Sequence, residues 1–138
     1  MQQLIADIFT YFSGSISLIF GLVYLFKKSF LNYHKNAIDT NWKDLNFEFQ
    51  TLILALMRAV SGGAIAVGFT IIILQYNLNP DNRNWMAFII LISGFIISIC
   101  SLYAMLMVRL QTKGKPPMII IFLSLILLSA GFFLNTNY

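Results

Sequence analysis

The 138-residue chain carries few charged residues and many apolar ones. Charged residues make up 10% and apolar residues 59% of the sequence, whereas a soluble domain has about 25% charged and about 45–50% apolar residues. A soluble domain of this length exposes too much of its surface to hide so many apolar side chains from water. The composition therefore excludes an ordinary soluble protein and indicates a membrane protein.

The formal net charge of +4 does not indicate a nucleic-acid-binding protein. Such a protein gathers its basic residues on one face, but the Lys and Arg residues of this chain stand between apolar segments. The single cysteine, Cys100, lies within an apolar run, which excludes an intrachain disulfide and a cysteine cluster for zinc. We expect membrane lipids as partners, and no nucleic acid.

Four apolar segments approach or exceed the roughly 20 residues that a helix needs to cross a membrane. We predict spanning helices over residues 4–26, 49–74, 85–108 and 118–134, of which the last is the shortest. The first segment lacks the basic start of a cleavable signal peptide and ends at Lys27 and Lys28, so we expect a retained helix.

Two of the three connections are short and rich in turn residues, which makes neighbouring helices antiparallel. The fold class that we expect is all-α, an integral membrane four-helix up-down bundle. It forms a single transmembrane domain over residues 1–138.

The remaining connection, residues 30–47, has an amphipathic pattern. Apolar and aromatic residues recur every three to four positions, with charged residues between them, at Phe30, His34, Ala37, Ile38, Trp42, Leu45 and Phe49. We predict one or two short helices lying at the membrane surface. An ordinary cuff around the bundle is the simpler interpretation, and a dedicated lipid sensor is the other.

The orientation follows from the Lys and Arg residues of the connections, because positive residues are retained in the cytoplasm. Seven of these residues belong to the first and third connections, namely Lys27, Lys28, Lys35, Lys43, Arg109, Lys113 and Lys115. The second connection has one, Arg83. We therefore expect both termini outside the cytoplasm, in a plasma or inner membrane.

Arg58 interrupts the second apolar segment, about 10 to 14 Å inside the predicted inner boundary. A charge at membrane depth is costly and is usually directed into the bundle. Residues at matching depths on the other helices predict a polar layer or ligand site made of Arg58, Ser101, Tyr103 and Ser124. The alternative is that Arg58 extends to the lipid headgroups.

Small residues recur at three- and four-residue spacings in three of the predicted helices, which favours close packing of helices over a ligand site. They are Gly14, Ser17 and Gly21 in the first helix, Ala55, Ala59, Gly62, Gly63 and Ala66 in the second, and Gly94 and Ser98 in the third. We predict that all ten lie at helix contacts.

Motifs for catalysis, metal ligation or cofactor binding are missing from the sequence, so we predict no catalytic residue, no metal and no cofactor. Asp7 is expected to be a solvated acid near Gln75, and His34 has no partner for a metal site. The first hypothesis is a non-enzymatic accessory or structural subunit that packs with itself or another membrane protein. The alternative is a small oligomeric transporter or channel for an anionic or amphipathic substrate, with Arg58 in its polar layer. A lipid-modifying enzyme that uses Arg58 to hold a phosphate is a weaker third.

Overall fold

The computed structural model describes residues 1–137, and all of its regular elements are helices. Four of them are long and apolar enough to cross a membrane: α1 (Gln2–Phe26), α3 (Phe47–Tyr76), α4 (Arg83–Gln111) and α5 (Met118–Thr136). The short helix α2 (Asn32–Ile38) and the 3₁₀ helix η1 (Trp42–Asp44) lie between α1 and α3. The predicted fold class is confirmed, and no predicted end of a spanning helix differs from the observed one by more than three residues.

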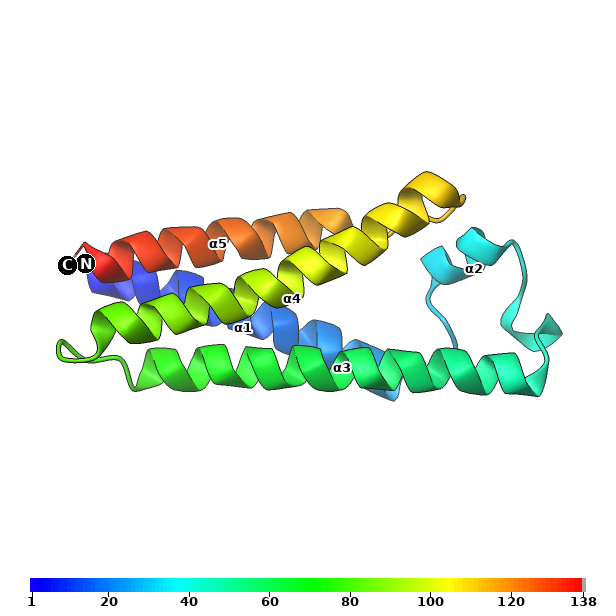
Figure 1. Ribbon diagram of the computed structural model, residues 1–138, viewed down its shortest axis with the longest axis horizontal. Coiled ribbons are helices and arrows are strands. Elements are labelled where there is room, and N and C mark those ends of the chain that lie inside the picture. The colour runs from blue at the N-terminus through cyan, green and yellow to red at the C-terminus, as the bar shows by residue number, and fades with distance from the viewer. Residues whose placement is uncertain (138) are drawn as a thin grey trace.

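Successive long helices run in opposite directions, as in an up-down bundle (Figure 1). α1 packs against α3 and α5, and α4 packs against the same two helices. The first turn of α1, the last turn of α5 and the connection from α3 to α4 lie together, and we call this the terminal end. The opposite end holds α2, η1 and the connection from α4 to α5. We call it the basic end, because Lys27, Lys28, Lys35, Lys43, Lys113 and Lys115 belong to its connections.

Glycines bring α1 and α3 into close contact. A Cβ atom placed on Gly68 would lie 2.8 Å from the carbonyl oxygen of Gly14, and one placed on Gly21 would lie 3.0 Å from the carbonyl oxygen of Ser61. Lipid tails are as apolar as these helices, so helices in a membrane associate through van der Waals packing and hydrogen bonds rather than through the hydrophobic effect. Backbone contact at glycine maximises that packing.

The centre of the bundle is filled by Ile71, Ile90 and Leu128, which come from α3, α4 and α5. Leu128 sits against Gly94, where an added Cβ would come within 2.5 Å of its side chain. Large apolar side chains such as Ile19, Ile96 and Ile126 point outward instead and are about 60% exposed or more. Apolar residues on the outside of four spanning helices are the pattern of a small multi-pass membrane protein.

Two short helices form the cap at the basic end, as the amphipathic pattern predicted. The ring of Phe30 is buried and meets Trp42 edge-on, with ring centroids 5.1 Å apart. α2 ends at Ile38 and is followed by Asp39, which has a φ of 52°, a left-handed conformation that Asp tolerates better than most residues. α3 then begins behind Asn46, whose side chain accepts a hydrogen bond of 2.9 Å from the backbone N–H of Phe49.

Candidate functional site

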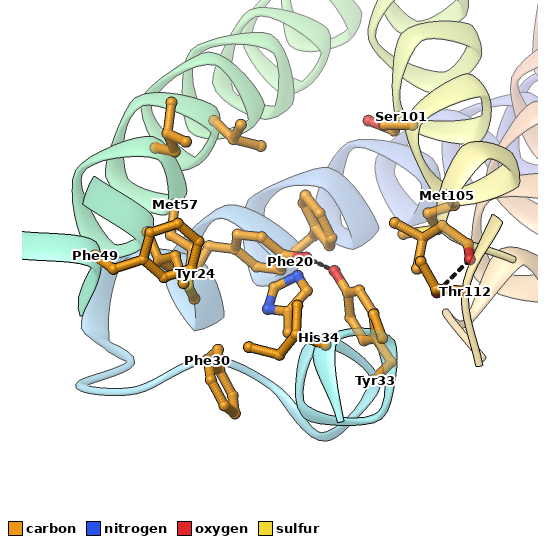
Figure 2. A pocket seen from close by; sticks show the side chains of 17 residues that line it. Phe20, Tyr24, Phe30, Tyr33, His34, Phe49, Met57, Ser101, Met105 and Thr112 are labelled. Carbon is orange, nitrogen blue, oxygen red and sulfur yellow. Dashed lines mark hydrogen bonds between the residues drawn. The ribbon is translucent and has the colours of Figure 1, made fainter. Parts of the chain in front are cut away.

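A pocket of about 480 Å³ lies at the basic end, where α3 and α4 diverge (Figure 1). Phe20 and Tyr24 of α1 contribute to it, and Tyr33 and His34 of α2 lie across it from the spanning helices (Figure 2). Ligand sites in proteins enclose roughly 300–1,000 Å³. The pocket is therefore large enough for a small molecule or for part of a lipid.

The walls of this pocket are almost entirely apolar. α3 contributes five of the lining side chains and α4 contributes four, namely Phe49, Ile53, Leu56, Met57 and Val60, and Ser101, Ala104, Met105 and Val108. No Asp, Glu, Lys or Arg is among the described residues that line it. A charged ligand would find no counter-ion on these walls.

Polar groups gather at one place in the pocket, where α1 meets α2. The hydroxyls of Tyr24 and Tyr33 are hydrogen-bonded to each other (Figure 2). The ring of His34 lies against that of Tyr33, with centroids 4.1 Å apart, and its Nδ1 accepts a hydrogen bond of 3.2 Å from the backbone N–H of Leu31. Burial lowers the pKa of His34 and raises the pKa of Tyr33, so both side chains are uncharged at neutral pH.

The pocket opens sideways between α3 and α4. Leu56 and Val60 on α3 are 59% and 45% exposed, and Ala104 on α4 is also exposed. Met57 and Met105 of the same two helices are buried behind them. The mouth is therefore framed by apolar side chains of two helices that are long enough to span a membrane.

The four residues of the predicted polar layer are not brought together. Arg58 is exposed and its guanidinium makes no hydrogen bond or ion pair with the described residues, and Tyr103 is 66% exposed on α4. Ser124 is buried, but its hydroxyl lies 2.7 Å from the hydroxyl of Ser13. Ser101 lines the basic-end pocket. The sequence could not reveal this, because residues at one depth can point in any direction around their helix axes.

Arg58 also lies less deep in the bundle than we predicted from its distance to residue 49, the predicted start of the second span. Ser13 is level with Ser124, which lies about 9 Å from the start of α5 at Met118. Gly21 lies about 12 Å beyond Ser13 in the same direction and contacts Ser61. Arg58 is a further three residues, or about 4.5 Å, along α3, so it lies roughly 7 Å beyond the start of α5. That position favours the alternative prediction, in which the side chain of Arg58 extends to lipid headgroups.

The predicted packing residues fall into two groups. Gly14, Gly21 and Gly94 are buried against neighbouring helices, as is Ser98. Ser17 donates a hydrogen bond of 2.9 Å to the carbonyl oxygen of Ala64 on α3. The small residues predicted on α3 are all exposed instead: Ala55, Ala59, Gly62, Gly63 and Ala66.

We call these five exposed residues the small face of α3. The bundle uses another face of the same helix, which carries Met57, Ser61, Ala64, Gly68, Ile71 and Gln75. Within the described part of the chain, a Cβ placed on Gly62 would have no atom within 4 Å. At about 100° per residue the two faces point in roughly opposite directions. The predicted contacts of the small face are therefore not made inside a single chain.

A polar cluster at the terminal end joins three helices. Asp7 accepts hydrogen bonds of 2.8 Å from Gln75 and 3.1 Å from Gln3, and Asn135 donates one of 3.2 Å to Gln75. The neighbourhood of Asp7 and Gln75 was predicted from their depth, but the part played by Asn135 was missed. Asn135 follows the last apolar run directly, so it resembled the first residue of a polar tail, yet it is 1% exposed.

Sequence reasoning also missed the pairing of Tyr24 with Tyr33. The two residues flank the Lys27-Lys28 pair, and only the return of the chain over the end of α1 brings their hydroxyls together.

No family model matches this chain, and no curated protein or solved structure matches it either.

Proposed function

We propose that this protein is a non-enzymatic subunit of a membrane-protein assembly, and that it packs against its partner through the small face of α3. The observation that carries the proposal is the exposure of Gly62 and Gly63 in the middle of a spanning helix. Small residues on a membrane helix let another backbone approach closely. α3 already uses such residues on its opposite face, where Gly68 meets α1.

The charge of Arg58 favours a partner other than a second copy of this chain. Arg58 lies on α3 beside the small face and is exposed. A parallel pair of α3 helices would bring two Arg58 guanidiniums to the same interface. Like charges that meet at a protein interface cost about several kcal/mol of binding free energy. The nearest acid on that side, Glu48, lies ten residues or about 15 Å away along the helix. A different membrane protein with a carboxylate at this depth fits better.

Site-specific photocrosslinking in native membranes tests the proposal. A photoreactive amino acid at Gly63 is expected to give one discrete adduct that contains a second membrane protein. The same amino acid at Ile126, which is 64% exposed on α5, is the matched control and should give only diffuse lipid adducts. Equal, diffuse labelling at the two positions would contradict the proposal. A single adduct with twice the chain's mass of 15.7 kDa would mean that the partner is a second copy of this chain.

A further inference from the structure

We propose that the basic-end pocket binds a neutral membrane amphiphile, a molecule with one long apolar chain and an uncharged head that carries a hydroxyl or carbonyl oxygen. The chain lies between α3 and α4. The head lies at Tyr24, Tyr33 and His34. Neither part of this site serves the proposed contact through the small face of α3.

The apolar walls specify the chain. Leu56, Val60 and Met105 belong to two helices that diverge, so their side chains cannot fill the space between them, and about 480 Å³ remains. Apolar walls around a volume of this size offer many van der Waals contacts to a molecule that fits between them. A flexible hydrocarbon chain makes those contacts and exposes no polar atom to the walls.

The polar groups specify the head. The Tyr24 and Tyr33 hydroxyls share one hydrogen bond, which leaves one O–H proton free to donate. Because Nδ1 of His34 accepts from Leu31, the proton of this neutral imidazole is on Nε2, which has no acceptor among the described residues. The site thus offers two donors to a polar head, and that head is uncharged because no cation lines the pocket.

The position of the mouth specifies the source of the ligand. The mouth is framed by Leu56, Val60 and Ala104, apolar residues that are exposed on two helices long enough to span a membrane, so a ligand can enter from the bilayer. Tyr33 and His34 belong to the cap at the bundle end, where heads of lipids lie. The lysines of that end are not among the residues that line the pocket, so a phospholipid phosphate at Tyr24 and Tyr33 would be desolvated without a counter-ion.

The test uses the full chain in phosphatidylcholine vesicles and three probes that carry the same photoreactive 16-carbon chain. The probes are a long-chain alcohol, the corresponding fatty acid at pH 8, and a phosphatidylcholine. The alcohol is expected to label peptides that contain Leu56, Val60 or Ala104, and an excess of unlabelled long-chain alcohol should suppress that labelling. The fatty acid and the phosphatidylcholine should label the same peptides at least about tenfold less at equal concentration.

Two variants locate the binding determinants. Ala104→Trp places an indole in the mouth and should abolish the saturable labelling, whereas Ile126→Trp on the lipid face of α5 should leave it unchanged. His34→Phe keeps a ring against Tyr33 but removes the Nε2 donor, and should weaken alcohol binding about tenfold, the loss expected for one hydrogen bond. Thermal unfolding of each variant is measured alongside, and His34→Phe stands as the test if Ala104→Trp does not fold.

Three results would overturn the proposal. One is labelling that unlabelled alcohol cannot suppress. Another is labelling by phosphatidylcholine as strong as that by the alcohol, which would mean that bulk lipid fills the groove. The third is a folded His34→Phe protein that binds the alcohol as well as the unchanged protein does.

Discussion

Each glycine of α3 has a different role because of the direction in which it faces. Gly68 is buried, and a Cβ there would lie 2.8 Å from a carbonyl oxygen of α1. Gly62, six residues earlier on the same helix, faces away from the bundle. The same substitution at the two positions should therefore have different consequences.

We expect Gly68→Leu to destabilise the bundle by about 1–3 kcal/mol or more, because backbone cannot yield to an added side chain as a flexible neighbour can. Gly62→Leu should leave the stability of the isolated chain unchanged and should abolish the crosslinked adduct that forms through the small face. Thermal unfolding in mild detergent measures the first effect, and photocrosslinking from Gly63 in membranes measures the second. A loss of stability in Gly62→Leu equal to that in Gly68→Leu would mean that the small face packs within the chain.

The guanidinium of Arg58 makes no hydrogen bond or ion pair with the described residues, so removing it leaves no buried group unsatisfied. We expect Arg58→Leu to be folded and to unfold within about 0.5 kcal/mol of the unchanged protein, as is usual for an exposed position. Arg58→Lys should behave alike. Chemical or thermal unfolding in detergent checks this, and a loss above about 2 kcal/mol in Arg58→Leu would restore the polar layer with Tyr103 and Ser124.

At the scale of elements, the docking of α2 depends on a glycine outside it. Gly114 is buried in the connection after α4, and a Cβ there would lie 2.9 Å from the carbonyl oxygen of Tyr33 and 3.1 Å from Cβ of Ala37. Lys113 and Asp39 also join the two segments through an ion pair of 3.0 Å. That pair is highly exposed, so it contributes little to docking.

We expect Gly114→Leu to push α2 away from the end of α4 and to raise hydrogen exchange of the α2 amides about tenfold, while the exchange of α1 and α5 stays unchanged. Lys115→Leu, one exposed residue further on, is the control and should leave α2 docked. Unaltered exchange in Gly114→Leu would show that α2 is held elsewhere.

The neutral state of His34 makes the same docking sensitive to pH. Burial lowers the pKa of His34 in the folded protein, so the undocked α2 binds a proton more readily than the docked one. The stability of docking is therefore full above the unperturbed pKa of about 6.5 and falls as the pH drops below it. Protonation also removes Nδ1 as the acceptor for the backbone N–H of Leu31. Tyr24 and Tyr33, whose rings contact His34, keep their protons throughout this range.

Hydrogen exchange of the α2 amides, corrected for its intrinsic pH dependence, should thus be faster at pH 5.5 than at pH 7.5. His34→Phe should remove the difference. Persistence of the pH effect in that variant would assign it to another group.

For the whole molecule, the sequence was sufficient to predict the four spans but not the faces that they bury. Hydropathy and length respond to the lipid around a helix, so α1, α3, α4 and α5 were found to within three residues. The rotation of a helix depends on its neighbours. α3 has small residues on both sides, with Gly62 and Gly63 on one and Ser61, Ala64 and Gly68 on the other, and composition alone does not decide which side packs.

The orientation of the whole bundle stays a prediction from the seven-to-one distribution of basic residues. Single cysteines in a Cys100→Ser background test it in intact cells. A membrane-impermeant thiol reagent should label Asn79→Cys directly, and should label Lys43→Cys only after the membrane is opened. The reverse pattern would place the basic end outside the cytoplasm.

The contact between α1 and α5 joins the first spanning helix to the last, and this affects the timing of folding during synthesis. α1 can pair with α3 as soon as both are inserted, since they meet through Gly14 and Gly68. Gly131 of α5 leaves room for the hydroxyl of Thr10, and the hydroxyl of Ser13 lies 2.7 Å from that of Ser124 on α5. Chains grow at about 5–20 residues per second, so roughly 5–20 s pass between the emergence of α1 and that of α5. For that interval the hydroxyl of Ser13 lacks its partner on α5, so the contact between the first and the last helix forms only when synthesis is nearly complete.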